Sequence, residues 1–134
     1  MKEFFLPYFI CLFLLLIIDG IWLNFIIKNF VHEHIGHLMS ESIRIAPVVA
    51  FYPLYAFGII VFVILPAIEG NFEPWRVFFL GGLLGLVAYG AYDLTNFATL
   101  KGWTLHMTLT DMAWGATLTG LVSTITFYLT RAIQ

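Results

Sequence analysis

Apolar residues fall into four long runs along the chain, each near the length that spans a membrane. The runs cover about residues 4–27, 46–67, 75–97 and 105–130. A helix needs about 20 mainly apolar residues to cross the hydrocarbon core of a bilayer. A chain of 134 residues can bury a soluble core, but four separate runs of this length favour lipid as the solvent. The pattern predicts four transmembrane helices in a single domain over residues 1–134.

The segments between the runs predict how the helices connect. Residues 28–45 are the most polar part of the chain, and Val31, Ile35 and Leu38 recur there at helical spacing. We interpret this segment as a short interfacial amphipathic helix. The other two connections are short and rich in turn residues, which favours antiparallel neighbours. We therefore expect an all-α membrane protein, an antiparallel four-transmembrane-helix bundle with an interfacial amphipathic helix between its first two spans and both termini on one side.

Small and kink-forming residues predict how the spans pack. Gly81 and Gly85 have the spacing that lets another helix backbone approach closely, so the third span is expected to be central. Pro53 predicts a kink in the second span. In the fourth span, Thr110, Thr117 and Thr124 repeat every seven residues, with Gly115 and Gly120 among them, a stripe typical of interhelical packing and hydrogen bonds in lipid.

Composition and charge exclude several classes of function. Hydrophobic residues make up 61% of the chain and charged residues 10%, well outside the balance of soluble domains. The net charge is -2 and the six Lys and Arg residues are scattered singly, so no basic patch for nucleic acid is present. Cys11 is the only cysteine, which excludes a disulfide framework within one chain. The basic residues are balanced between the two sides, so the membrane orientation stays open.

Three aspartates lie within the apolar runs. Asp19 lies about two-thirds of the way through the first span, Asp93 near the end of the third, and Asp111 about a turn and a half into the fourth. Because successive spans alternate in direction, all three are expected in the same half of the membrane. An ionisable residue within a span costs about 2.5–3.5 kcal/mol on insertion scales, so it indicates function. Asp93, Asp111 and Asp19 are therefore the candidate catalytic residues.

Helical spacing places further polar and aromatic residues beside these aspartates. The candidate ligand-binding residues are Trp22, Tyr89, Asn96 and Trp114. Tyr89 and Asn96 share a helix face with Asp93, and each tryptophan follows an aspartate by one turn. The arrangement predicts a polar, aromatic-walled pocket open toward one leaflet, with Asp93 and Asp111 as an acid–base pair. The alternative is structural: the aspartates cap helix ends or bond to Thr, Asn and Trp side chains and hold the bundle together.

Histidines offer a metal or haem site as a less favoured alternative. On a helix, His34 and His37 are neighbours while His32 points elsewhere, and Glu33, His37 and Glu41 form an ordinary ladder on a solvated face. We therefore predict no cofactor. The alternative metal or haem ligands are His32, His34, His37 and His106.

The remaining aromatic residues lie mostly near the ends of the predicted spans. Trp and Tyr are enriched at membrane interfaces, so an interfacial belt accounts for most of them without a ligand. The residues concerned are Tyr8, Tyr52, Tyr55, Trp75, Trp103 and Tyr128.

Short motifs along nearly the whole chain carry a family resemblance. They are Asp19-x-x-Trp22-Leu23, Phe51-Tyr52, Leu65-Pro66-Ala67, Tyr92-Asp93-Leu94-Thr95-Asn96 and Asp111-x-x-Trp114-Gly115. On these motifs the chain resembles a family of bacterial predicted membrane proteins, domain of unknown function 2177. The resemblance implies a four-helix protein of the bacterial inner membrane and brings no activity with it. The histidines at residues 32–37 are not part of the family pattern.

The residues support hypotheses from three classes of function. The first is a protein that binds or modifies a lipid or other apolar small molecule through its carboxylates, with membrane lipids as partners. The second is a small proton- or cation-coupled transporter, in which Asp19, the deepest aspartate, is the best-placed residue and the chain forms a homo-oligomer. The third is a structural accessory subunit of a membrane complex.

Overall fold

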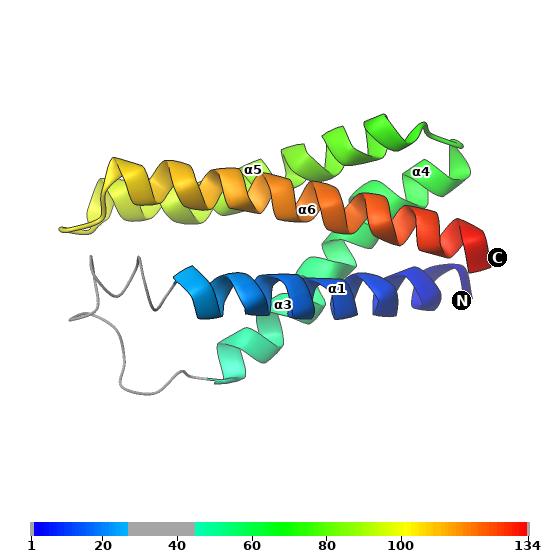
Figure 1. Cartoon of the computed structure of the whole chain (residues 1–134), viewed down its shortest axis with the longest axis horizontal. Helices are drawn as coiled ribbons and strands as arrows, with labels where there is room; N and C mark the ends of the chain where they lie inside the picture. Colours follow the sequence, from blue (N-terminus) through cyan, green and yellow to red (C-terminus); the bar gives the residue numbers. More distant parts are fainter. Residues whose placement is uncertain (1, 27–44, 134) are drawn as a thin grey trace.

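The computed structural model describes residues 2–26 and 45–133, and each structural statement below concerns these residues. Helix α1 covers Lys2–Ile26. The second span consists of three consecutive segments, α3 (Ile45–Ile59), the π-helix η3 (Ile60–Ile64) and α4 (Leu65–Glu69). Helices α5 (Pro74–Thr99) and α6 (Leu105–Ile133) complete the described fold (Figure 1).

The predicted four-helix membrane architecture is confirmed within this part of the chain. Four helical stretches are long and apolar enough to cross a membrane: Phe4–Asn24, Val49–Glu69, Pro74–Thr99 and Leu105–Ile133. The chain is therefore an integral membrane protein, and its outer surface fits that environment. Phe13, Leu54 and Phe62 each expose more than half of their surface, where a soluble domain would carry polar groups. The interfacial helix expected at residues 28–45 falls almost wholly outside the described residues.

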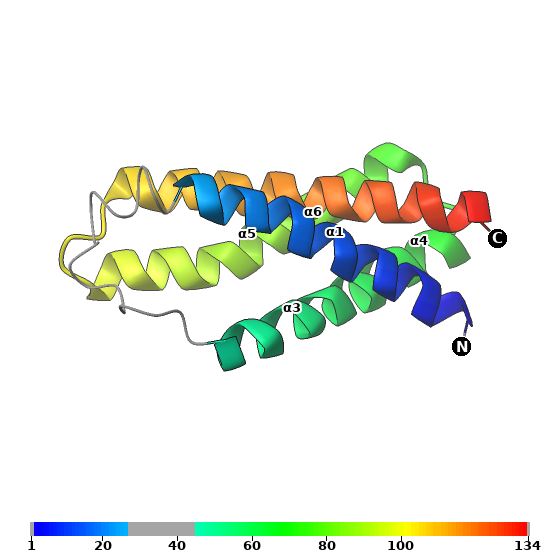
Figure 2. The same ribbon diagram turned by 60° about the horizontal axis from the view of Figure 1, so that its bottom comes forward.

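Helices α5 and α6 form the closest pair and run side by side along their length, with α1 lying against α6 (Figure 1). The second span packs against α1, and it approaches α5 most closely at η3. From there α3 diverges from α5 toward its own N-terminal end (Figure 2). Both chain ends lie at the end of the bundle where α4 meets α5, as expected for four antiparallel spans.

Glycines explain why α5 and α6 come so close. A Cβ atom on Gly81 would lie 2.6 Å from Ser123 Oγ, and one on Gly85 would overlap the carbonyl oxygen of Gly115. Only a residue without a side chain allows the two backbones to approach to this distance. The close approach predicted at Gly81 and Gly85 is therefore confirmed. The expectation that the third span is central is wrong, because α6 packs against α5, α1 and the second span, whereas α5 packs mainly against α6.

The threonine stripe predicted for the fourth span does not form the interhelical contact. Thr117 is exposed, and its hydroxyl donates to Ala113 O of the same helix at 2.8 Å. Thr124 likewise donates to Gly120 O at 2.7 Å. The buried face of α6 lies on neighbouring positions, which include Gly115, Thr119, Ser123, Thr126 and Thr130.

The second span changes its helical hydrogen bonding at η3 rather than at Pro53. Helix α3 continues through Pro53 to Ile59. At the end of η3 the backbone N–H of Leu65 donates to Ile60 O, five residues back. The next residue, Pro66, has no N–H, and in a regular α-helix its ring would press on the carbonyl group of Phe62. The wider π-turn directly before Pro66 relieves this clash.

Candidate functional site

Asp19 is the centre of a hydrogen-bond network that joins three of the four spans. Its side chain is 5% exposed, with Oδ1 accepting from Trp114 Nε1 at 3.0 Å and Oδ2 accepting from the Tyr52 hydroxyl. The Trp114 indole in turn stacks on Trp22, with ring centroids 4.2 Å apart and planes within 5° of parallel. Asp19 of α1 is thus held by donors from α3 and α6, and each carboxylate oxygen has a partner.

Tyr52 and Tyr55 were predicted as interfacial belt residues, and this prediction is wrong. Their side chains are 9% and 8% exposed and point into the bundle. The Tyr55 hydroxyl is hydrogen-bonded to Thr119 Oγ1 at 2.6 Å, and Tyr52 is bonded to Asp19. The sequence contained a pattern that could have predicted this burial. Tyr52 and Tyr55 are spaced with Ala56 and Ile59 so that all four lie on one face of α3, which is the buried face.

Tyr89 lies between the α5–α6 contact and this network. A Cβ atom on Gly115 would overlap the Tyr89 ring, so Gly115 makes room for the aromatic side chain. The Tyr89 ring centroid lies 6.2 Å from that of Tyr55. Tyr89 also interacts electrostatically with Asp19 and Asp111, which places it beside the aspartates as the sequence indicated.

Asp93 and Asp111 form a second carboxyl cluster, between α5 and α6. Asp93 is fully buried, and no N–H or O–H group among the described residues donates to its carboxyl oxygens. The carboxyl group of Asp111 lies within hydrogen-bonding reach of it, and the two can bond once one of them holds a proton. The half-buried Asp111 lies close enough to interact electrostatically with both Asp93 and Asp19. All three aspartates therefore occupy one region of the bundle. Asp19 accepts hydrogen bonds from Trp114 and Tyr52, whereas Asp93 and Asp111 face each other as two carboxyl groups.

Asn96 lies at the edge of this region. Its side chain is half-buried and interacts with Tyr92 of the same helix. The Tyr92 ring meets Trp103 edge-on at 5.8 Å, which covers this end of the cluster. Asn96 is near Asp93 in sequence and on the same helix, but no hydrogen bond joins the two side chains.

The described residues contain no group of three or more His, Cys, Asp or Glu side chains arranged to hold a metal ion. His106 lies exposed in the first turn of α6. The other candidate metal or haem ligands, at residues 32, 34 and 37, lie outside the described part of the chain.

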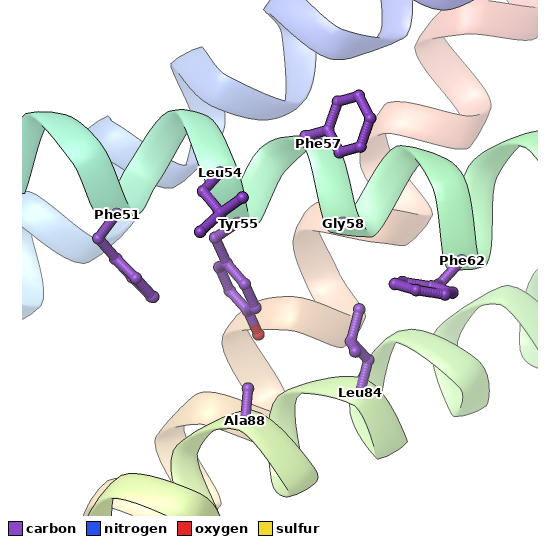
Figure 3. A pocket seen from close by; sticks show the side chains of 8 residues that line it. All are labelled: Phe51, Leu54, Tyr55, Phe57, Gly58, Phe62, Leu84 and Ala88. Carbon is purple, nitrogen blue, oxygen red and sulfur yellow. The ribbon is translucent and has the colours of Figure 1, made fainter.

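A groove opens between the second span and α5, close to the polar network. Its volume is about 320 Å³, and its eight lining residues come from α3, η3 and α5 (Figure 3). None of the seven candidate site residues lines it. Tyr55 connects the two features, because its ring lines the groove while its hydroxyl is bonded inside the bundle to Thr119.

Comparison with known proteins identifies one family. The family described as "Predicted membrane protein (DUF2177)" matches residues 4–128, which is most of the chain and includes every candidate site residue. No curated protein and no solved structure matches the chain.

Proposed function

Because the chain belongs to the family of predicted membrane proteins described as DUF2177, we propose a function within the bilayer: Asp93 and Asp111 bind the polar group of a lipid or other apolar small molecule and exchange a proton with it. The family resemblance also supports a location in the bacterial inner membrane.

The state of Asp93 is the observation that carries this proposal. A carboxyl group without hydrogen-bond partners is costly in any apolar interior, and most of all in a membrane. Asp93 has no exposed surface, and the group within hydrogen-bonding reach of it among the described residues is another carboxyl group, that of Asp111, rather than an N–H or O–H donor. A ligand that donates or accepts a hydrogen bond at this position would compensate that cost. An intramembrane carboxyl group held in this state is a functional site by default.

The pairing of Asp93 with Asp111 supplies the chemistry. When one of two adjacent carboxyl groups holds a proton, the pair presents a donor and an acceptor side by side. Such a pair can hydrogen-bond a hydroxyl, carbonyl or amine group of a ligand and pass a proton to or from it. Tyr89 and the stacked Trp22–Trp114 rings provide aromatic walls nearby.

Asp19 has a different role in this proposal. Its two oxygens already accept hydrogen bonds from Trp114 and Tyr52, so it ties α1, α3 and α6 together. This also weakens the transporter hypothesis, which used Asp19 as the carboxylate that alternates between proton and substrate. The hypothesis of a purely structural cluster accounts for Asp19 directly, whereas it accounts for Asp93 only if Asp93 and Asp111 share a proton and bond to each other.

The test is to measure what co-purifies with the protein. Wild type, Asp93→Asn and Asp111→Asn are purified from native membranes in mild detergent, and the bound small molecules are identified by mass spectrometry. We expect a bound lipid or apolar molecule in wild type and at least a tenfold loss of it in both variants, with little change in the melting temperature.

Glu69→Gln is the matched control, because it makes the same chemical change at an exposed carboxylate at the end of α4. It should retain the molecule at the wild-type level. The proposal fails if the Asp93 and Asp111 variants retain the same molecules as wild type. It also fails if both variants unfold in detergent and the wild type carries no ligand.

A further inference from the structure

The groove between the second span and α5 has the shape and surface of a site for a single hydrocarbon chain. Phe51, Phe57 and Phe62 line it from the second span, and Leu84 and Ala88 line it from α5 (Figure 3). We propose that this groove holds the hydrocarbon chain of an amphipathic lipid whose polar end lies at Asp93 and Asp111. The polar end of this inference rests on the proposed function, whereas the site for the chain stands on the groove itself.

Gly58 creates much of the space. It lies between Tyr55 and Phe62 on the wall of the groove, and Figure 3 shows Leu84 across from it on α5. A Cβ atom built on Gly58 would meet nothing within 4 Å. In this respect Gly58 differs from Gly81, Gly85 and Gly115, each of which is required by a close neighbour. The missing side chain therefore leaves volume that no other part of the described protein fills.

The surroundings of the groove identify its occupant as a lipid chain. Leu54 and Phe62, at its rim, are 69% and 68% exposed, and they lie on a span that crosses the membrane. The neighbouring medium there is the hydrocarbon of the bilayer. Water is a poor occupant, because an apolar cavity offers it no hydrogen-bond partners. A flexible hydrocarbon chain fills an elongated apolar groove without leaving a polar group unsatisfied.

The groove leads toward the polar network, which makes the proposed ligand amphipathic. Tyr55 lines the groove and is hydrogen-bonded to Thr119 on the far side of its ring. Tyr52 follows the groove residue Phe51 directly in sequence and is bonded to Asp19. A chain lying along α3 from Phe62 toward Phe51 would therefore direct its polar end toward the half of the bundle that contains the aspartates, with Tyr52 and Tyr55 between them.

Photo-crosslinking tests whether the hydrocarbon chain of a lipid lies in the groove. The protein is reconstituted in phosphatidylcholine vesicles with a small share of phosphatidylethanolamine that carries a diazirine on one acyl chain. After illumination, labelled peptides are mapped by mass spectrometry. We expect labelling concentrated on the groove residues Phe57, Phe62 and Leu84. A Cβ atom at position 58 meets nothing within 4 Å, so Gly58→Leu should place its side chain in the groove and reduce this labelling at least fivefold.

Gly20→Leu is the matched control. Gly20 is also a helical glycine whose added Cβ would meet nothing within 4 Å, but it lies on α1, away from the groove. It should label as wild type does. Ala88→Leu provides a second block from the α5 wall if Gly58→Leu proves unstable. Even labelling of all lipid-facing positions, unchanged by either block, would overturn the inference.

The same variants separate this inference from the proposed function. One outcome is that Gly58→Leu loses groove labelling while Asp93→Asn still retains the co-purifying molecule. That result would support the groove as the site of the hydrocarbon chain and contradict the proposed role of the carboxyl pair. If Gly58→Leu labels as wild type does while Asp93→Asn loses the bound molecule, the carboxyl pair stands and the groove inference fails.

Discussion

At the scale of single residues, the three aspartates show that the same side chain serves different purposes in one bundle. Asp19 accepts hydrogen bonds from Trp114 and Tyr52, whereas Asp93 is buried beside the carboxyl group of Asp111 without an N–H or O–H donor among the described residues. The sequence could place both in one half of the membrane, because depth follows from the number of residues along a helix. The sequence could not show which aspartate would accept hydrogen bonds, because the donors to Asp19 come from helices far away in the chain.

This difference predicts opposite effects on stability. Asp19→Leu should leave the Trp114 N–H and the Tyr52 hydroxyl without an acceptor, at a cost of about 1–3 kcal/mol for each buried donor. Asp93→Leu removes a buried carboxyl group whose neighbour is another carboxyl group, that of Asp111, so no N–H or tyrosine donor loses its acceptor and the variant should be neutral or stabilising. Thermal unfolding in one detergent, followed by far-UV circular dichroism, compares the two. Equal destabilisation would instead assign Asp93 a structural role.

At the scale of helices, glycine spacing was a reliable signal and threonine spacing was not. Gly81 and Gly85 lie four residues apart on one face of α5, and their contact with α6 followed directly. Thr110, Thr117 and Thr124 keep a strict seven-residue spacing, and the face they share lies beside the one that packs on α5. The face of a helix that packs is the face turned toward its neighbour. The sequence of one helix does not specify where that neighbour lies.

The α5–α6 contact predicts a sharp difference between Gly85 and Gly82, three residues apart on the same helix. Gly85→Ala should force the two backbones apart, because its Cβ would overlap the Gly115 carbonyl oxygen, and overpacking of this kind costs about 1–3 kcal/mol or more. Gly82→Ala is the control, since its Cβ would lie 3.6 Å from Ala116 O, an ordinary contact. That variant should be neutral or gain up to about 1 kcal/mol from helix propensity. A comparable loss of melting temperature in both would contradict the packing described for α5 and α6.

At the scale of the whole molecule, four spans determine which connections share a side of the membrane. The chain ends and the α4–α5 turn lie at one end of the bundle, and the α5–α6 connection lies at the other (Figure 1). The aspartates belong to the half of the bundle that contains the α5–α6 connection. The carboxyl groups therefore lie nearer to one leaflet than to the other.

Cysteine accessibility in intact cells tests this arrangement. In a Cys11→Ala background, single cysteines replace the exposed residues Glu69, Lys101 and Ala132. A membrane-impermeant maleimide should label Glu69→Cys and Ala132→Cys from one side and Lys101→Cys only from the other. Labelling of all three from the same side would contradict the four-span topology, and the side observed for Lys101 fixes the orientation.

The sequence by itself determined the architecture and the depth of the acidic residues. The length of each apolar run gives the spans, their alternation gives the topology, and helical rise gives the depth of each aspartate, because these quantities depend only on local chain geometry. It also identified Trp22, Tyr89 and Trp114 as neighbours of the aspartates.

Only the tertiary structure decided how these residues meet. The position of Tyr52 near a predicted span end indicates an interfacial residue, yet Tyr52 faces Asp19 across the contact between α1 and α3. The groove at Gly58 arises because α3 diverges from α5. The angle between these two helices cannot be read from the sequence of either one. Hydrogen bonds and cavities between helices depend on the rotation and angle of each helix against its neighbours, and packing sets both only when all the spans are assembled.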